Sequence, residues 1–461
     1  MPRSSTGVPG LDDILGGGLP KNRVYLVKGP PGSGKTTLAL QFLRAGVEAG
    51  ESSLYITLSE TEEEIRQVVR SHGWTLDGVH LFELSNAEQT LRLDDENTLY
   101  AAEDTDLKEA MRVLLDEVDR LKPTRVVFDS LSEIRLLAQN ASRYRRQLLA
   151  LKQHFAGRAC TVLLLDDRTE DGADLKIESL AHGVLTLEQM PVQYGADRRR
   201  LRVGKLRGSS FRSGYHDFTV KTGGLQAFPR LVAAEHRTEL TAEPISSGIG
   251  SLDDILGGGI DRATCTLLVG PAGVGKSAIS TQFACAAAAR GEPAAMFLFE
   301  ERIGTWRKRG EFLCEGLGEH LASGQLMVHQ IDPAELAPDE FTHLVRRSVE
   351  ERGVRLVVID SMTGYFTAMP EARFLSLQMH ELLSYLSDHG VASLMTMAQT
   401  GLVGQMTSTV DVSYLADTLV LFRYYEMKGQ LQKAISVLKK RSGFHEGTIR
   451  NLSLGREGIT V

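Results

Sequence analysis

The sequence predicts an α/β fold that is built twice along the chain. The block LDDILGGG begins at Leu11 and recurs unchanged at Leu252, 241 residues later. In both copies, short apolar runs alternate with helix-length segments, which is typical of a parallel sheet covered by helices on both faces. A glycine-rich motif also follows the first apolar run of each copy. Solenoid repeats span about 20 to 50 residues, so a repeat of this length indicates a duplicated domain.

Four apolar runs in each copy are expected to form the parallel strands. They are Val24–Val27, Leu54–Leu58, Val126–Phe128 and Val162–Leu165 in the first copy, and Thr266–Val269, Ala295–Phe299, Leu356–Ile359 and Ser393–Met397 in the second. Alternating, partly basic segments close the copies at Arg200–Arg207 and Ala434–Arg441, and these are expected to be late antiparallel strands. The polar stretch Ala227–Pro244 separates the copies. The predicted domains are therefore residues 1–232 and 233–461.

The glycine-rich motifs predict two phosphate-binding loops. Both Gly29–Thr36 and Gly270–Ser277 fit G-x-x-x-x-G-K-[ST], and each follows a strand and opens a helix. Glycines let backbone N–H groups surround phosphate oxygens, and the helix N-terminus adds its positive dipole. A chance glycine-rich turn is the alternative, but two matches at one offset argue against it. The expected nucleotide-binding residues are Gly29, Gly32, Ser33, Gly34, Lys35, Thr36 and Thr37, and Gly270, Gly273, Val274, Gly275, Lys276, Ser277 and Ala278.

A magnesium ion beside each loop would need oxygen ligands. The hydroxyls of Thr36 and Ser277 are expected to supply one each, as in other P-loop proteins. The apolar runs that end at Asp129 and Asp360 supply a Walker-B carboxylate in each copy, although a lone Asp there can also be a strand-ending turn residue. The expected metal ligands are therefore Thr36, Asp129, Ser277 and Asp360.

Hydrolysis also needs a group that positions or deprotonates the attacking water. The second apolar run of each copy ends in acidic residues, Glu60 in the first copy and Glu300–Glu301 in the second. In a doubly wound sheet the carboxyl ends of neighbouring strands face one crevice, which makes these carboxylates candidate bases. A solvated acidic loop is the alternative. Gln399 ends the next apolar run and could contact the γ-phosphate, with Asp166 as its expected counterpart.

Two pairs of cations lie near the ends of the copies. Lys205 and Arg207 are two residues apart on an expected strand, as are Lys439 and Arg441, so each pair shares a strand face. Such a pair could reach into a neighbouring subunit's site as an arginine finger does. The alternative is a solvated basic edge that prevents aggregation.

Composition excludes several classes of protein. With 52 Lys and Arg against 59 Asp and Glu, the formal net charge is −7, which counts against nucleic acid and anionic lipid as partners. No apolar stretch approaches the roughly 20 residues that a membrane helix needs, and the N-terminus lacks the apolar core of a secretory signal. We therefore expect a cytoplasmic protein without a membrane anchor. The four cysteines, Cys160, Cys265, Cys285 and Cys314, lie far apart in the sequence. We expect them to be reduced thiols.

Taken together, the paired loops, the LDDILGGG lead-ins, the acidic strand ends and the closing K-x-R pairs resemble the KaiC family of circadian-clock ATPases and autokinases. The similarity runs over essentially the whole chain, and Ala434–Arg450 resembles the ending of the family's second domain. The resemblance implies two RecA-like P-loop domains in tandem and a homohexameric ring, with ATP and Mg²⁺ bound between subunits. It further implies that Lys205, Arg207, Lys439 and Arg441 act on the neighbouring subunit's nucleotide.

The same resemblance implies an ATP hydrolase in the first domain and a serine/threonine-type autokinase in the second. The family's acceptors are a consecutive Ser-Thr before a strand that resembles Ala416–Phe422; here the pair reads Ser413-Tyr414. Ser413 is therefore the expected phosphoacceptor and Tyr414 a second one. The alternative makes Ser413 a loop hydroxyl and Tyr414 a packing aromatic.

Two further departures from the family bear on activity. The family's adjacent glutamates read Ser59-Glu60 in the first domain, so hydrolysis there is expected to be slow or to depend on Glu60. The second domain keeps both, and Glu300 is the expected general base. The chain ends at Val461, and the resemblance implies that it lacks the tail through which clock proteins engage their activator. A signalling role is then expected alongside, or in place of, timekeeping, with an unidentified protein partner.

Two other functions compete with this interpretation. A nucleotide-driven switch or scaffold without kinase activity would assemble with ATP as one ring or as stacked rings, and the missing first-domain glutamate fits it. A DNA motor of the RecA or DnaB type shares the fold and the P-loop, but the chain lacks basic stretches interleaved with aromatic residues. A GTPase is disfavoured because no N-K-x-D motif is present.

Overall fold

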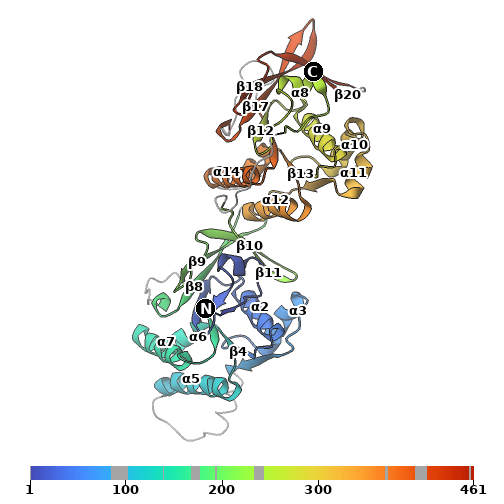
Figure 1. Cartoon of the computed structure of the whole chain (residues 1–461). Helices are drawn as coiled ribbons and strands as arrows, with labels where there is room; N and C mark the ends of the chain where they lie inside the picture. The colour runs from blue at the N-terminus through green and yellow to red at the C-terminus, as the bar shows by residue number, and fades with distance from the viewer. Residues whose placement is uncertain are drawn as a thin grey trace. The chain divides into compact units, whose positions relative to one another are not determined.

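The computed structural model describes residues 2–84, 102–138, 140–167, 177–192, 195–232, 243–368, 372–399, 413–455 and 458–461. Contacts divide the chain into two compact units (Figure 1). The first comprises Met1–Gln193 and Asp197–Arg230, and the second Leu231–Val461 with Tyr194–Ala196. Residues 233–242 of the expected linker, which include the predicted start of the second domain, lie outside the described residues.

The first unit is organised around a mixed sheet of nine described strands in the order β11-β10-β9-β8-β3-β7-β6-β4-β5. Strands β8, β3, β7, β6, β4 and β5 are parallel, whereas β9, β10 and β11 are antiparallel. In that sheet order, the strands span Gly224–Phe228, Tyr215–Lys221, Arg198–Leu206, Gly183–Met190, Val24–Gly29, Thr161–Asp167, Arg125–Asp129, Ser53–Thr57 and Val79–Glu83.

The second unit repeats this plan among its described residues, with the order β14-β13-β15-β16-β12-β17-β18-β19-β20. The strands from β14 to β17 are parallel, and β18, β19 and β20 are antiparallel. Their bounds, again in sheet order, are Leu326–Gln330, Ala294–Leu298, Leu356–Asp360, Ala392–Ala398, Cys265–Gly270, Thr418–Met427, Gln430–Lys440, Arg450–Gly455 and Gly458–Thr460. The predicted α/β class is confirmed in both units.

Helices cover both faces of each parallel region, as Figure 1 shows. In the first unit they are α1 (Leu11–Ile14), α2 (Lys35–Glu48), α3 (Glu62–Ser71), α5 (Ala102–Leu121), α6 (Leu131–Ala138) and α7 (Ala141–Phe155). In the second unit they are α8 (Gly250–Ile255), α9 (Lys276–Ala289), α10 (Ile303–Leu313), α11 (Leu317–Ser323), α12 (Pro338–Arg352), α13 (Met362–Ala368) and α14 (Ala372–Asp388). Short elements complete the description: β1 (Arg3–Ser4), β2 (Leu19–Pro20), and the 3₁₀ turns η1 (Ile177–Ser179) and η3 (Ser413–Leu415).

The central strands are apolar on both faces because each face has its own core. Along β3, Tyr25 and Val27 pack into the cluster on the α2 side, whereas Val24 and Leu26 pack into the cluster that contains residues of α5, α6 and α7. Successive side chains of a strand point to opposite faces, so a strand buried on both sides reads as a continuous apolar run. This is why the runs in the sequence predicted the central strands.

The repeated LDDILGGG block forms the same loop in both units. The Asp12 carboxylate accepts a hydrogen bond from the Thr6 backbone N–H at 2.8 Å, and Asp253 accepts one from Ser247 N–H at the same distance. Gln41 and Gln282 then tie this loop to the helix that follows each P-loop, through side-chain bonds to the backbone oxygens of Gly7 and Ser247. The block therefore has a structural role beside each glycine-rich loop.

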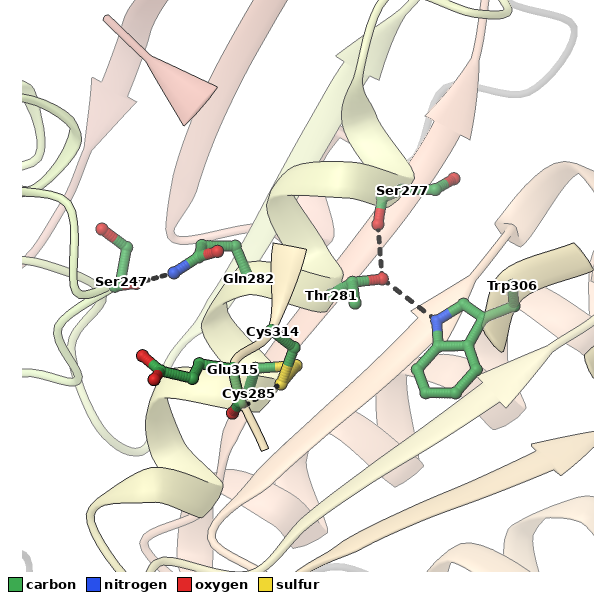
Figure 2. The surroundings of a disulfide bond; sticks show 8 residues. All are labelled: Ser247, Ser277, Thr281, Gln282, Cys285, Trp306, Cys314 and Glu315. Atoms are coloured by element: carbon green, nitrogen blue, oxygen red, sulfur yellow. Dashed lines mark hydrogen bonds between the residues drawn. A yellow bond between two sulfur atoms is a disulfide. The ribbon is translucent and has the colours of Figure 1, made fainter. Parts of the chain in front are cut away.

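The cysteine prediction was half wrong. Cys285 of α9 and Cys314, which directly follows α10, form a disulfide across 29 residues of sequence (Figure 2). The prediction failed because sequence spacing does not reveal that α10 packs beside α9. Cys160 and Cys265 are free and buried, and burial raises the pKa of each thiol to about 12, so neither is a reactive thiolate.

Across the described residues, no helix is both long and apolar enough to cross a bilayer.

His216 makes the stability of the first unit depend on pH. It is fully buried; its Nδ1 accepts from the Arg230 N–H at 2.9 Å, and its Nε2 lies 3.0 Å from the Arg212 carbonyl oxygen. Burial lowers the pKa of His216 to about 4, and the nearby positive charges of Arg230 and Arg212 lower it further. Between pH 6.5 and 4 the unfolded chain binds more protons, so stability falls as the pH falls through this window.

We expect the first unit to lose about 2 kcal/mol more stability between pH 8 and pH 5 than the same unit carrying His216→Gln. Urea unfolding at both pH values measures this difference. The chain has one tryptophan in each unit, Trp74 and Trp306, so a Trp306→Phe background makes the fluorescence report the first unit. Equal pH dependence in both proteins would contradict the assignment.

Candidate active sites

The fold brings the predicted site residues to the carboxyl ends of the parallel strands in each sheet. Because β3, β7, β6 and β4 are parallel neighbours, their carboxyl ends meet at the P-loop, with Gly29 opposite Asp167 and Asp129 opposite Thr57. Ligands of open α/β sheets bind beyond these strand ends. In the second unit the corresponding pairs are Gly270 with Ala398 and Asp360 with Leu298.

Each P-loop has the backbone of a phosphate cradle. The φ angles of Gly32 and Gly34 are 76° and 100°, and those of Gly273 and Gly275 are 75° and 124°. These positive values favour glycine because a side chain would be strained there. Helices α2 and α9 begin at the P-loop lysines, so their unpaired N–H groups and positive dipole ends face the cradle.

The two P-loop lysines have different surroundings. The Lys276 Nζ atom donates to the carbonyl oxygens of Gly270 and Pro271, 2.7 and 2.8 Å away, and burial lowers the pKa of this lysine to about 8. Lys35 donates to the equivalent carbonyls at 2.9 Å and in addition forms an ion pair with Asp167, Nζ to Oδ1 2.8 Å. A carboxylate thus contacts the P-loop lysine in the first unit.

The four predicted metal ligands lie beside the P-loops and fit a magnesium ion. Asp360 is buried: Thr396 donates to its Oδ1, whereas its Oδ2 has no hydrogen-bond partner among the described residues. A carboxylate oxygen left without a donor, at the carboxyl end of β15 near the P-loop lysine Lys276, suits a hard cation that takes oxygen ligands. In the first unit the Asp129 Oδ2 accepts from Thr36 at 2.8 Å and from Tyr55 at 2.5 Å.

The predicted bases of the second unit do not share one environment. Glu300 accepts a hydrogen bond from Ser361, the residue after Asp360, at 2.7 Å. Glu301 instead forms a two-pronged ion pair with Arg309 of α10, with both distances 2.7 Å. Glu300 is therefore the carboxylate that faces the P-loop side, and Glu301 anchors the following helix.

In the first unit Glu60 corresponds to Glu301, and Ser59 corresponds to Glu300. The main chain of Glu60 is held by Thr57, whose Oγ1 lies 3.0 Å from the Glu60 nitrogen and 2.6 Å from its oxygen. Partial desolvation and then the Asp129 and Glu64 carboxylates raise the pKa of Glu60. At the position equivalent to Glu300, the first unit has only the exposed hydroxyl of Ser59.

Asp167, which lies at the centre of the first site, was not among the predicted site residues. Besides Lys35, it contacts Ser132 at 2.9 Å and Ser130 at 3.3 Å, and both hydroxyls donate to its Oδ2. Its signal is the acidic pair that ends the run Thr161–Asp167, of which only the first member was considered. The pairing of Asp166 with Gln399 was wrong: the register makes Ala398 the counterpart of Asp167.

Asp166 itself forms an ion pair with Arg135 at 2.6 Å, so it is engaged elsewhere. Gln399 follows the end of β16, where its N–H donates to the Gly270 oxygen at 3.1 Å. Its buried Oε1 has no hydrogen-bond partner among the described residues. Gln399 therefore lies beside the second P-loop with a carbonyl oxygen available.

A second missed feature is a cation from the late hairpin that contacts each P-loop. Arg199 of β9 donates to the Gly32 oxygen at 3.1 Å, and Lys433 of β18 donates to the Gly273 oxygen at 3.2 Å. The strand pairings make these two positions equivalent in the two units. Only the antiparallel register, which the sequence does not reveal, brings them to the loops.

The K-x-R pairs lie near the amino-terminal ends of the central parallel strands, whereas the P-loops follow the carboxyl ends. Leu206, between Lys205 and Arg207, pairs with Gly183, which in turn pairs with Tyr25 near the start of β3. In the second unit Lys440 pairs with Thr418, which pairs with Thr266 near the start of β12. The P-loops follow the other ends of β3 and β12, so neither cation pair is near the P-loop of its own unit.

The predicted phosphoacceptors lie on the same side of the sheet as the K-x-R pair, near the amino-terminal ends of the parallel strands. Ser413 begins η3, and its side chain lies outside the described residues. Tyr414 is 54% exposed, and Arg441 contacts its backbone oxygen at 3.5 Å. Lys439 donates to the Ala416 oxygen at 2.7 Å. The acceptor segment and the K-x-R pair thus form one surface, distant from the P-loop of the same unit.

Comparison with known proteins gives one family. A family model described as the KaiC ATPase matches residues 4–232 and again residues 245–461. The circadian clock oscillator protein KaiC of Parathermosynechococcus lividus is 25% identical over 497 residues, covering 100% of this chain and 85% of the relative. The circadian clock protein KaiC3 of Synechocystis sp. is 25% identical over 466 residues, covering 99% and 91%. KaiC of Acaryochloris marina is 26% identical over 494 residues, covering 99% and 88%.

Proposed function

Because this chain belongs to the KaiC family and is an ATPase of that kind, we propose that it works as a cytoplasmic homohexameric ring with Mg²⁺-ATP bound between subunits. Its second domain transfers the γ-phosphoryl group to Ser413 or Tyr414 of the adjacent subunit. Its relatives are named as circadian clock proteins, so timing or signalling through a protein partner is the corresponding role for this chain.

One observation carries this proposal: the P-loop and the K-x-R pair lie at opposite ends of the parallel strands in each sheet. A cation must lie within contact distance of the phosphates to stabilise their developing charge. Within one unit the length of the strands separates the two groups. A ring of identical head-to-tail interfaces brings the surface with the P-loop on one subunit against the surface with the K-x-R pair on the next. Each of the two described units would then contribute to a composite site.

The second site has the parts that phosphoryl transfer requires. Ser277 and Asp360 would hold Mg²⁺, which neutralises phosphate charge when bound. Lys276 contacts the β- and γ-phosphate oxygens once they replace the loop carbonyls. Glu300 lies at the carboxyl end of β13, held by Ser361, where it can accept the proton of an incoming hydroxyl. Lys439 and Arg441 of the adjacent subunit accompany Ser413 and Tyr414 to the same γ-phosphate.

We assign ATP hydrolysis, rather than transfer to a side chain, to the first site. The segment before β8 that corresponds to Ser413-Tyr414 ends with η1, at Ile177–Ser179. Lys205 and Arg207 contact this segment through the backbone oxygens of Glu178 and Ser179. In the second unit Arg441 contacts the Tyr414 oxygen of η3, and Lys439 contacts the Ala416 oxygen that follows η3. Water is then the expected acceptor in the first domain. The competing function, a nucleotide-driven switch with no kinase activity, rests on Ser59 in place of a glutamate.

The molar mass in solution tests the ring directly. Light scattering after size-exclusion chromatography, with Mg²⁺-ATP present, is expected to give six times the mass of the chain, or twelve times if two rings stack. Since the nucleotide lies in the interface, a Lys35→Ala, Lys276→Ala double variant is expected to elute mainly as single copies. A mass of one chain for the unaltered protein with Mg²⁺-ATP would contradict the proposal.

A further inference from the structure

We propose that Asp167 is the carboxylate that positions and activates water in the first site, in place of the glutamate that the end of β4 lacks. The inference rests on the proposed function, because it requires a γ-phosphate at Lys35. It assigns the reaction of the first domain to a residue on a different strand from the one that serves the second domain.

In each unit, the serine that follows the Walker-B aspartate donates a hydrogen bond to a carboxylate at the site. Ser130 and Ser361 occupy equivalent positions, each directly after the Walker-B aspartate. In the second unit Ser361 donates to Glu300, which follows β13. In the first unit Ser130 donates to Asp167, which ends β7. The strand that supplies the carboxylate has changed, but the hydroxyl that orients it has not.

Strand registers show that this is an exchange between two positions. The counterpart of Glu300 is Ser59, and the counterpart of Asp167 is Ala398. The first unit therefore lacks a carboxylate where the second has one, and has one where the second has a methyl group. Glu60 corresponds to Glu301, which binds Arg309 in the second unit. Its carboxylate, however, interacts with Asp129, Asp167 and Lys35, so a Glu60→Gln variant must be compared with Asp167→Asn.

Asp167 is also located where water would attack. Strand β7 lies between β3 and β6 in the sheet, so Asp167 ends between the P-loop and Asp129. Its Oδ1 is 2.8 Å from the Lys35 Nζ, the atom that contacts the γ-phosphate in P-loop proteins. Although burial alone would raise the pKa of Asp167, hydrogen bonds from Lys35, Ser132 and Ser130 lower it, so the group is ionised at neutral pH.

The step is balanced with water as the only co-reactant. When ATP binds, Lys35 turns to the phosphates, and Asp167 keeps its bonds to Ser130 and Ser132. The water oxygen bonds to the γ-phosphorus as the bond to the oxygen that bridges the β- and γ-phosphates breaks. The electron pair of that bond leaves on ADP. The water proton passes to Asp167 and then to the released phosphate.

The experiment measures ATP turnover by the first site alone, in chains that carry Lys276→Ala to silence the second site. Asp167→Asn keeps the size of the side chain and its capacity to accept from both serines. It is expected to lower kcat about 100-fold or more, the usual contribution of a general base. A fluorescent non-hydrolysable ATP analogue is expected to bind at least as tightly as before, because Lys35 loses a competing partner.

Two further variants make the result specific. Ser59→Glu, added to Asp167→Asn, restores a carboxylate at the Glu300 position and is expected to recover at least a tenth of the lost turnover. Asp166→Asn is the matched control, one residue away on the other face of β7 and bound to Arg135; turnover is expected to stay within threefold. Thermal unfolding, followed by Trp74 fluorescence in a Trp306→Phe background, verifies that the first unit of each variant folds.

Several outcomes would overturn the proposal. Unchanged kcat in Asp167→Asn would do so, as would loss of analogue binding together with kcat, which would make Asp167 a structural residue. Loss of turnover in Glu60→Gln with retention in Asp167→Asn would assign the role to Glu60. No turnover in Lys276→Ala, with turnover in Lys35→Ala, would leave no reaction for Asp167 to support. Turnover absent from every chain, the unaltered one included, would instead contradict the proposed function.

Discussion

In protein that carries Lys276→Ala, incubation with Mg²⁺-ATP is expected to leave Ser413 and Tyr414 without phosphate, whereas the unaltered protein is expected to carry it there. Lys276 is the buried cation of the second P-loop, and nothing else among the described residues of that loop can neutralise the β- and γ-phosphates. Removing one preorganised donor from such a site costs about 10²- to 10³-fold in rate. Mass-spectrometric mapping of phosphorylated residues after a fixed incubation measures the effect.

The matched control is Lys35→Ala, which makes the same change in the first P-loop. Because phosphate transfer is assigned to the second domain, this variant is expected to keep phosphorylation wherever it still assembles. Ser413→Ala and Tyr414→Phe separate the two acceptors. An unaltered protein that turns ATP over but carries no phosphate on either residue would contradict the kinase and leave the nucleotide-driven switch.

Strands β3, β4, β6 and β7, and β12, β13, β15 and β16, could be predicted from the sequence because burial on both faces makes them continuous apolar runs. Strand β8 beside β3 was missed, because its burial alternates towards its end. Strands β5 and β14 were missed because they form the edges of the described sheets, and their residues are largely half-buried. The helix that follows each P-loop was predicted from the motif alone. The last strands of the second unit were missed because they form antiparallel pairs among themselves, with a weak apolar pattern.

For the candidate sites, the motifs identified the residues whose spacing is local. The P-loop residues and the Walker-B aspartates each lie in one continuous segment, so spacing was enough. Asp167 carried a local signal, because it ends an apolar run as Asp129 does, and it was overlooked. Arg199 and Lys433 instead reach the sites only through strand pairing, and no local pattern distinguishes them from surface charges. The Cys285–Cys314 disulfide was missed for the same reason, since it depends on how α9 and α10 pack.

The structure also shows that the duplicated domains have diverged at the site itself. In the second unit the Walker-B aspartate has an oxygen without a partner, and the P-loop lysine contacts only loop carbonyls among the described residues. In the first unit the equivalent aspartate accepts from Thr36 and Tyr55, and Lys35 is paired with Asp167. The first site must break an ion pair before its lysine can bind phosphate. We therefore expect the two domains to differ in rate and in nucleotide affinity.

Mixing two inactive variants tests the composite site most directly. Lys276→Ala removes the P-loop lysine of the second site, and Arg441→Ala removes the cation that the neighbour would supply. Loss of such a cation costs about 10³- to 10⁵-fold in kcat, so the second site of either variant alone is expected to be inactive. Arg307→Ala, which removes an exposed arginine from α10, is the matched control and is expected to keep its activity.

When the two inactive variants are mixed in equal amounts before ATP is added, about one interface in four combines an intact Lys276 with an intact Arg441. We therefore expect phosphorylation and turnover by the second site to return to about a quarter of the unaltered level. The readout is the phosphate on the acceptor segment and the ATP turnover above that of each variant alone. A mixture no more active than its components, although the subunits exchange, would contradict a site shared between neighbouring subunits.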